Sequence, residues 1–378
     1  MNKVQRILFL LINSLFVAKY SIRGGLNPFI SVSLYCLFTI TIWLFISKRK
    51  PQNNRTLKIA YFFSISLLII GILLLHFFIN PYSLQVDRWS AIHNFLQNLF
   101  NGVYPYSAHT HLGGYGSPFP VWQAFHIPFY LLGNVGLGML FSIILLSIFL
   151  IWLFNNYHRA LIYIILMAIS PAFWYEAAVR SDLIYNFILC FIAIGFIYKK
   201  KYSIQQQALG LGILCGLFLS TRFSIVIPFA IYLFPDFISS DIKQKLIFVS
   251  VAMLVFIISF LPFVFWNNTL FFFKYNPFVL QTRQGSLIEV LLISITGIYL
   301  STKWKGSISN CFGYIAITII ILVITTFLHR MISDNFVNGL FDSAYDITYF
   351  NMALPFMIYV LADNNLMTLT KKNNIKSV

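Results

Sequence analysis

Charged residues are scarce in this chain: Asp, Glu, Lys and Arg make up only 10% of its 378 residues. A soluble domain carries about 25% charged residues, because its surface must be hydrated. Hydrophobic residues fill 59% of the positions instead. The shortage of charge therefore excludes a soluble globular protein and predicts an integral membrane protein.

Acidic residues and cysteines are also few, with ten Asp and Glu and four Cys in the whole chain. The cysteines all fall in or at the ends of apolar stretches, so they suggest neither a disulfide framework nor a metal-binding spacing. The alternating pattern of a membrane β-barrel is missing as well. These absences favour an all-α architecture.

Long apolar stretches are what the chain has in place of charge. A stretch of about 20 apolar residues crosses a hydrocarbon core about 30 Å thick as a helix, because lipid offers no partner for unpaired backbone groups. We predict a polytopic transmembrane helical bundle of about twelve spans that forms a single integral membrane domain over residues 1–378. The predicted ranges are 7–20, 28–47, 57–79, 135–154, 160–175, 182–198, 206–220, 223–235, 246–266, 286–301, 310–328 and 346–362.

The net charge of +16 is distributed unevenly between the segments that connect these spans. With the amino terminus in the cytoplasm, the inner segments hold 18 of the 26 basic residues and the outer segments hold 8. Because cytoplasmic segments of membrane proteins are usually the basic ones, the charge needs no nucleic-acid partner. The pattern predicts a multi-pass protein of the cell inner or plasma membrane, with both termini cytoplasmic and residues 80–134 extracytoplasmic.

The outer segment 80–134 contains two predicted interfacial helices. From Trp89 to Phe100, apolar residues recur at the spacing of one helical face, and Gly102 follows where a helix-ending glycine belongs. Residues 119–132 are apolar but too few to span the bilayer, which predicts a second interfacial or re-entrant helix.

Asp87 stands directly before the first interfacial helix. One interpretation is an N-cap, because an Asp side chain there accepts hydrogen bonds from the free backbone N–H groups of the first turn. The other is a catalytic base, which uses the same exposed carboxylate. The two interpretations do not exclude each other.

Several short motifs resemble the polytopic glycosyltransferases of the C-type fold (GT-C). After Asp87 and its helix come Gly-x-Tyr-Pro-Tyr at 102–106 and Tyr-x-x-Pro-Phe-Pro at 115–120. Further along, Ser170-Pro171 precedes Asp182, and Arg222 precedes a proline-containing helix. The resemblance covers about residues 57–230.

This resemblance implies an inverting transfer of a sugar on the extracytoplasmic face. The donor would be a polyprenyl phosphate or pyrophosphate, and the acceptor a glycan, a lipid or a protein. Such a transfer needs a carboxylate to take the acceptor proton and cations to neutralise the leaving phosphate. We expect Asp87 as the general base, with Asp182 and Glu176 as second acids.

The other expected site residues fall into two groups. The donor phosphate would be bound by Arg88, Arg180, Arg222 and Arg283, with Lys274 also available. The substrate would be lined by Tyr104, Tyr106, His109, His111 and Tyr115. We expect no transition-metal site, because no Cys or paired acid joins the histidines, and the sequence leaves a divalent cation open.

Alternative interpretations remain open at the level of the sequence. Each outer arginine could contact lipid headgroups, and aromatic residues are enriched at the interface in every membrane protein. An envelope-polysaccharide polymerase, a lipid-linked oligosaccharide flippase and a transporter would also have many spans.

Overall fold

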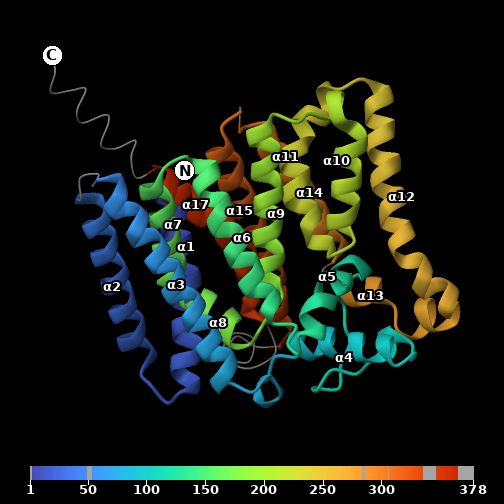
Figure 1. Cartoon of the computed structure of the whole chain (residues 1–378), viewed down its shortest axis with the longest axis horizontal. Helices are drawn as coiled ribbons and strands as arrows, with labels where there is room; N and C mark the ends of the chain where they lie inside the picture. The colour runs from blue at the N-terminus through green and yellow to red at the C-terminus, as the bar shows by residue number, and fades with distance from the viewer. Residues whose placement is uncertain (1, 49–52, 283–285, 305, 335–345, 365–378) are drawn as a thin grey trace.

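The computed structural model describes residues 2–48, 53–282, 286–304, 306–334 and 346–364 (Figure 1). Within these ranges the regular structure is helical, with one isolated antiparallel bridge between His109 and Tyr115. The prediction of an all-α polytopic bundle is confirmed.

Helices occupy all twelve predicted spans. Seven of them are long and apolar enough to cross a membrane on their own: α1 (Asn2–Arg23), α2 (Pro28–Lys48), α3 (Asn54–Phe78), α6 (Leu137–Phe154), α9 (Leu183–Lys200), α12 (Ile242–Trp266) and α15 (Ile308–Asp334). Four shorter predicted spans coincide with α10 (Ile204–Leu219), η3 (Phe223–Ile225) with α11 (Val226–Ser239), α14 (Leu287–Ser301), and η5 (Ile347–Ala353) with α17 (Leu354–Asn364).

The remaining predicted span is a bent pair. α7 (Tyr157–Ala168) and α8 (Pro171–Ala178) meet at 66°, because Pro171 has no N–H to continue the ladder of α7. Ser170 Oγ accepts the N–H of Phe173 at the start of α8. Asn13 Oδ1 of α1 accepts the Ser170 hydroxyl at 2.6 Å and the Ala172 N–H at 3.2 Å. The break is thus satisfied from inside the protein, as lipid surroundings require.

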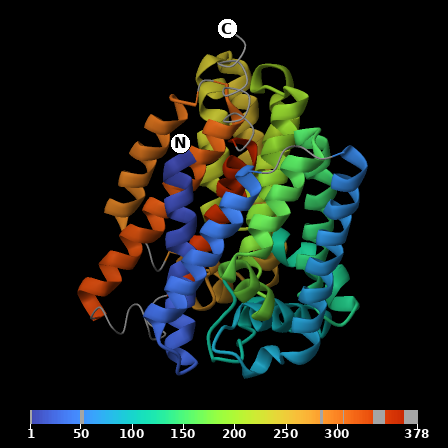
Figure 2. The ribbon, with the colours of Figure 1, turned by 90° about the vertical axis from the view of Figure 1, so that its left-hand side faces the viewer.

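The connection between α3 and α6 forms one end of the bundle. α4 (Arg88–Phe100) lies across that end, and α5 (Pro120–Leu131) lies between α4 and the spans (Figure 1). The start of α1 and the end of α17 lie at the opposite end (Figures 1 and 2). We call the first of these ends the α4 end.

Both predicted interfacial helices are therefore present. Gly102 has φ +70° after α4, and its N–H donates to Leu99 O while Val103 N–H donates to Asn98 O. These two bonds form the motif that a C′ glycine permits at a helix end.

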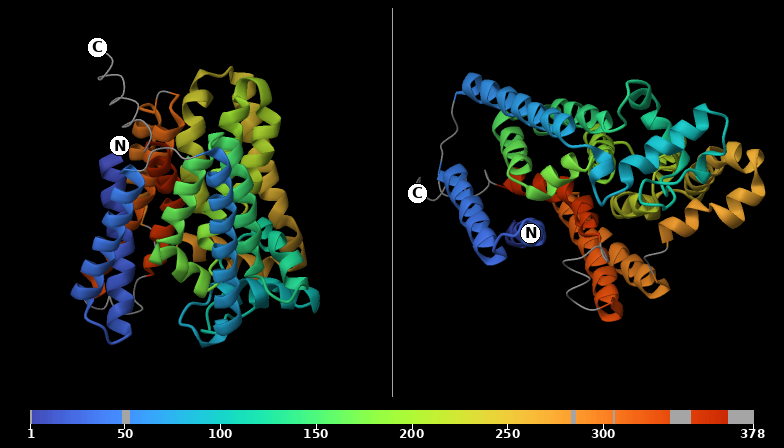
Figure 3. Two further views of the ribbon diagram at one scale, coloured as in Figure 1. Left: turned by 60° about the vertical axis from the view of Figure 1, so that its left-hand side comes forward. Right: turned by 90° about the horizontal axis from the view of Figure 1, so that it is seen from below.

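Two glycines fit α10 closely against α12. An added Cβ at Gly216 would lie 2.6 Å from Ala252 O, and one at Gly212 would lie 2.9 Å from Phe248 O. Small residues four apart allow membrane helices to approach in this way. Seen from below, α12 and α2 lie at opposite edges of the bundle (Figure 3).

Two short elements follow α12 at the α4 end. These are a π-helical turn, η4 (Leu270–Lys274), and α13 (Pro277–Thr282). Two 3-10 turns, η1 (Pro81–Ser83) and η2 (Pro105–Ser107), flank α4.

Candidate functional site

A buried ion pair lies at the α4 end, between the connections that precede α9 and follow α10. Arg222 Nη2 donates to Asp182 Oδ2 at 2.5 Å, and the two side chains are 9% and 1% exposed. Trp122 Nε1 of α5 donates to the same oxygen at 2.6 Å. Among the described residues, Asp182 Oδ1 and Arg222 Nε have no hydrogen-bond partner although both are buried. Asp182 Oδ1 can therefore accept a hydrogen bond from a further polar group, and Arg222 Nε can donate one to it.

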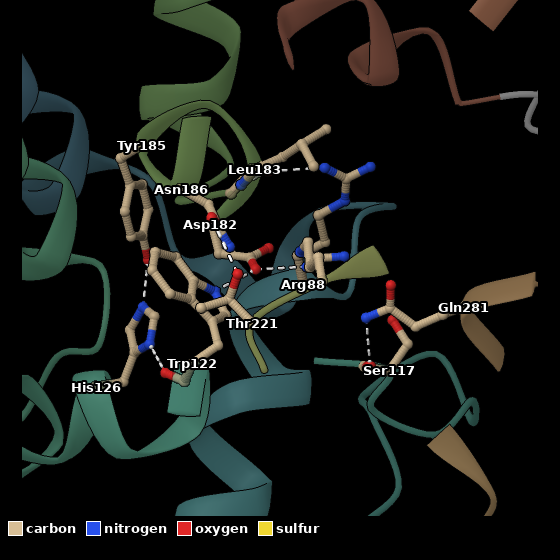
Figure 4. A network of polar contacts seen from close by, with 12 residues as sticks. Arg88, Ser117, Trp122, His126, Asp182, Leu183, Tyr185, Asn186, Thr221 and Gln281 are labelled. Atoms are coloured by element: carbon tan, nitrogen blue, oxygen red, sulfur yellow. Dashed lines mark hydrogen bonds and ion pairs between the residues drawn. The ribbon is translucent and has the colours of Figure 1, made fainter. Parts of the chain in front are cut away.

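His126 and Tyr185 form hydrogen bonds that hold Trp122 in place (Figure 4). His126 Nδ1 lies 2.6 Å from Trp122 O, and His126 Nε2 lies 2.5 Å from the Tyr185 hydroxyl. A neutral ring that donates from Nδ1 and accepts at Nε2 satisfies both contacts. Burial lowers the pKa of His126 to about 4, so the ring is neutral near pH 7.

Arg88, at the start of α4, makes a second ion pair close to the first. Its Nη2 donates to Asp346 Oδ2 at 2.6 Å and its Nη1 donates to Ser181 Oγ at 3.1 Å. Since Ser181 directly precedes Asp182, both arginines converge on the connection between α8 and α9. Burial acts to raise the pKa of the Asp182 carboxyl, but Arg222 and Arg88 outweigh it and hold that pKa below its usual range.

Glu176 lies on α8 and Arg180 lies within this connection, and both side chains accept from or donate to backbone groups at helix ends. Glu176, fully buried on α8, accepts the Ile184 N–H in the first turn of α9 at 3.2 Å. Arg180, with φ +50°, donates to His76 O and, at 2.9 Å, to Ile79 O at the end of α3. The described contacts of both side chains are thus structural, and their predicted catalytic or phosphate-binding roles stay predictions.

Asp87 occupies the N-cap position of α4, but its carboxylate makes no capping hydrogen bond. Instead, Oδ2 accepts the Thr110 hydroxyl at 2.8 Å, and the side chain is half-buried. The structure therefore separates the two interpretations of Asp87: the position is that of a cap, and the side chain is not used as one. No hydrogen bond or ion pair of the described residues joins Asp87 to Asp182 or Arg222.

The predicted histidines contact different parts of the outer segment. His111 contacts Ser90 Oγ through Nδ1 at 2.7 Å and Leu84 O through Nε2 at 2.8 Å. His109 Nδ1 lies 3.3 Å from Gly113 O. Over the described ranges, no group of three His, Cys, Asp or Glu side chains is arranged to hold a metal ion.

All three predicted tyrosines pack against aromatic residues of α12 or of the segment that follows it. Tyr106 is buried, and its hydroxyl donates to Pro118 O at 3.4 Å. Tyr104 and Tyr115 both lie against Tyr275, with ring centroids 6.4 and 4.9 Å away. Lys274 is next to Tyr275 in the chain, and Arg283 lies outside the described residues.

Sequence reasoning missed the residues that orient Asp182 and Arg88. No role is assigned from the sequence to Trp122, which bonds to Asp182, or to His126 and Tyr185. Asp346 is not identified there as the partner of Arg88 either. One signal was present, since Gln123 and His126 are polar side chains in a mostly apolar helix. Comparison with known proteins found no protein-family model, no curated protein and no solved structure that matches this chain.

Proposed function

We propose that this membrane protein is a glycosyltransferase that moves a sugar from a polyprenyl phosphate or pyrophosphate donor to an acceptor at the α4 end, with inversion. The observation that carries the proposal is the placement of Asp87. Its carboxylate precedes an interfacial helix, stays partly accessible and is free of capping. Its neighbour Arg88 donates to Ser181, which precedes Asp182 of the buried ion pair, and to Asp346.

A general base must reach the proton that it removes. Among the described residues, the Asp87 carboxylate accepts one hydrogen bond, from Thr110, and a carboxylate has about four acceptor sites. Asp87 thus retains capacity for an acceptor hydroxyl. Asp182 is 1% exposed and already accepts from Arg222 and Trp122 at one oxygen, which makes it the second choice for the base.

The leaving phosphate requires positive charge that is already in position. Arg88 and Arg222 supply two guanidinium groups at the same connection between α8 and α9, and a guanidinium can bind two phosphate oxygens through its planar fork. Arg222 Nε is a buried donor without a partner among the described residues. Asp182 and Asp346 hold the arginines in place before a phosphate arrives.

The test compares Asp87→Asn with Asp241→Asn. Asp241 is a matched control because it also occupies an N-cap position without capping through its side chain, at the start of α12. The purified variants in nanodiscs are assayed for sugar transfer from hexosyl and pentosyl polyprenyl phosphates. We expect Asp87→Asn to lower the rate about 10²–10⁴-fold, the usual contribution of a general base, and Asp241→Asn to leave it unchanged. Normal transfer by Asp87→Asn together with loss in Asp182→Asn would assign the base to Asp182.

A second candidate is a flippase or another transporter. The bent α7–α8 pair favours it, because transporters form substrate sites at interrupted helices, and α8 carries the fully buried Glu176. Proteoliposomes that contain a fluorescent lipid-linked oligosaccharide distinguish the two functions. A transporter moves this lipid between leaflets without covalent change, whereas the proposed enzyme consumes a sugar donor.

A further inference from the structure

A small cavity lies where the first outer segment meets the segment that follows α12. Its volume is about 140 Å³, and its walls include Tyr115 on one side and Lys274, Tyr275 and Asn276 on the other. Drug-sized ligands fill about 300–1,000 Å³, so this cavity suits a smaller group. Residues far apart in the sequence build it, and α12 and α13 carry the second wall to the α4 end (Figure 1).

The walls combine aromatic rings with a cation. The Tyr115 and Tyr275 rings are 4.9 Å apart and tilted by 57°, and Lys274 Nζ lies 5.2 Å from the centre of the Tyr275 ring. An aromatic face is negative and attracts the weakly positive C–H groups of a sugar ring. A lysine ammonium has three donors for hydroxyl groups or for an anionic substituent. These features match a saccharide.

The rim of the cavity is strongly apolar. Phe272, Phe273 and Val279 line it and are 50%, 86% and 60% exposed. Aromatic and basic residues gather where a membrane meets water, so this rim suits the boundary between headgroups and acyl chains. A free saccharide or a protein glycan gains nothing from such a rim, whereas a sugar attached to a lipid does.

The cavity is also connected to Asp87 through one loop. Thr110 donates its hydroxyl to Asp87 and accepts the Gly114 N–H at 3.1 Å. A Cβ at Gly114 would lie 3.4 Å from Asp87 Oδ2, and Gly114 directly precedes Tyr115. The carboxylate of Asp87 therefore contacts the same short loop, 110–115, that ends in the aromatic wall.

We infer that the cavity binds the sugar headgroup of a glycolipid and that this glycolipid is the acceptor. The inference rests on the proposed function. In the transfer, a hydroxyl oxygen of the glycolipid bonds to the anomeric carbon of the donor sugar. The bond from that carbon to the phosphate oxygen breaks with its electron pair on the phosphate, and the hydroxyl proton passes to Asp87.

Photo-crosslinking tests the binding without requiring transfer. The full-length protein is placed in phosphatidylcholine nanodiscs with a diazirine-bearing monoglycosyl or diglycosyl diacylglycerol, and crosslinked residues are mapped by mass spectrometry. We expect crosslinks at 272–280 that unlabelled glycolipid displaces. Tyr115→Ala and Tyr275→Ala should each lower them about tenfold, since a stacked ring and its buried area together contribute at least about one tenfold step in affinity. Tyr299→Ala, on an exposed tyrosine of α14, is the matched control and should leave them unchanged.

The inference is overturned by no crosslinks at 272–280 with either probe, by displacement with phosphatidylglycerol as well as with glycolipid, or by crosslinks that both tyrosine variants retain. Displacement by free disaccharide as efficient as by glycolipid also overturns it, because the ligand would then be an aqueous sugar. Crosslinking as expected without transfer to the glycolipid leaves the binding site standing and removes its role as acceptor, whereas the absence of transfer from the polyprenyl donors to any acceptor removes the proposed enzymatic function. The two proposals can therefore fail separately.

Discussion

Trp122 and Asp182, 60 positions apart in the chain, are joined by a hydrogen bond of 2.6 Å from the indole Nε1 to the carboxylate Oδ2. This bond fastens the interfacial helix α5 to the start of the span α9. The segment before α5 is attached to a second span, because Phe119 N–H donates to Thr221 O and Val121 N–H donates to Ser220 O, both at 3.1 Å. Residues 119–122, at the start of α5, are thus bonded to the same connections that contain Asp182 and Arg222.

We expect Arg222→Gln to destabilise the protein strongly. Removal of one partner from a buried ion pair leaves the other charge uncompensated and typically costs about 3–5 kcal/mol. The matched control is Arg159→Gln, whose side chain and partner Asp363 are 30% and 16% exposed, so that solvent screens this pair more than the pair of Arg222 and Asp182 and its loss should cost less. Thermal unfolding of the purified variants in detergent measures both.

A double variant, Asp182→Asn with Arg222→Gln, completes this test. If the pair is the cause, the double variant loses less stability than the sum of the single variants, because neither charge is left alone. Additive losses would show that the two side chains contribute independently, and the ion pair would not be the stabilising contact.

The stability should depend on pH through His126. Above pH 6.5 the ring is neutral in both the folded and the unfolded chain. As the pH falls from 6.5 toward 4, the ring takes up a proton in the unfolded chain. In the folded protein the buried ring stays neutral over this range, because burial lowers the pKa of His126 to about 4. The free energy of unfolding therefore decreases across this window, by at most about 1.4 kcal/mol per pH unit.

His126→Gln cannot titrate and serves to isolate this contribution. We expect the variant to be less stable at pH 7, since it cannot reproduce both contacts of the ring, and to lose less stability between pH 6.5 and 4. Unfolding midpoints in detergent at a series of pH values give the comparison. An identical slope in both proteins would assign the pH dependence to other groups.

The sequence was sufficient for the elements of the fold because their signals are local. Apolar length located the spans, and the glycine at 102 located the end of α4. The bend between α7 and α8 was not predicted, although Pro171 was noted, because apolar length alone does not show a change of direction. The fold depends there on Asn13, which is remote in sequence.

The candidate site was predicted only in part, because its pairings join distant segments. Asp182 and Arg222 were both expected at the outer face, and the structure brings them into contact. The partner of Arg88 is Asp346, 258 positions away, and no local pattern identifies it. The contacts of Arg180 with the end of α3 could not be predicted from the sequence either, because their acceptors are backbone carbonyls, which every residue has.

We expect Gly216→Ala to weaken the contact between α10 and α12. The added methyl group would lie 2.6 Å from Ala252 O, a backbone atom that cannot turn away. Overpacking of this kind typically costs about 1–3 kcal/mol. Gly210→Ala is the matched control on the same helix, because its Cβ would have no atom within 4 Å.

Gly216→Ala should therefore lower the melting temperature, whereas Gly210→Ala should not. Alanine is favoured over glycine in a helix interior by about 0.5–1 kcal/mol, so Gly210→Ala should be neutral or slightly stabilising. Equal melting temperatures for the two variants would mean that the close approach at Gly216 does not contribute to the packing.

The last prediction concerns the orientation in the membrane. The inner segments contain 18 basic residues and the outer segments 8 when the amino terminus is cytoplasmic, and the positive-inside rule then places the α4 end outside the cell membrane. Leu112, in the loop after α4, is 46% exposed, and Lys303 lies exposed in the turn between α14 and α15 at the opposite end. In a background with Cys36→Ser, a membrane-impermeant maleimide applied to intact cells should label Leu112→Cys and spare Lys303→Cys until the membrane is permeabilised. The reverse pattern would place the polar cluster of Asp182, Arg222 and Arg88 in the cytoplasm, and an extracytoplasmic transfer reaction could not occur there.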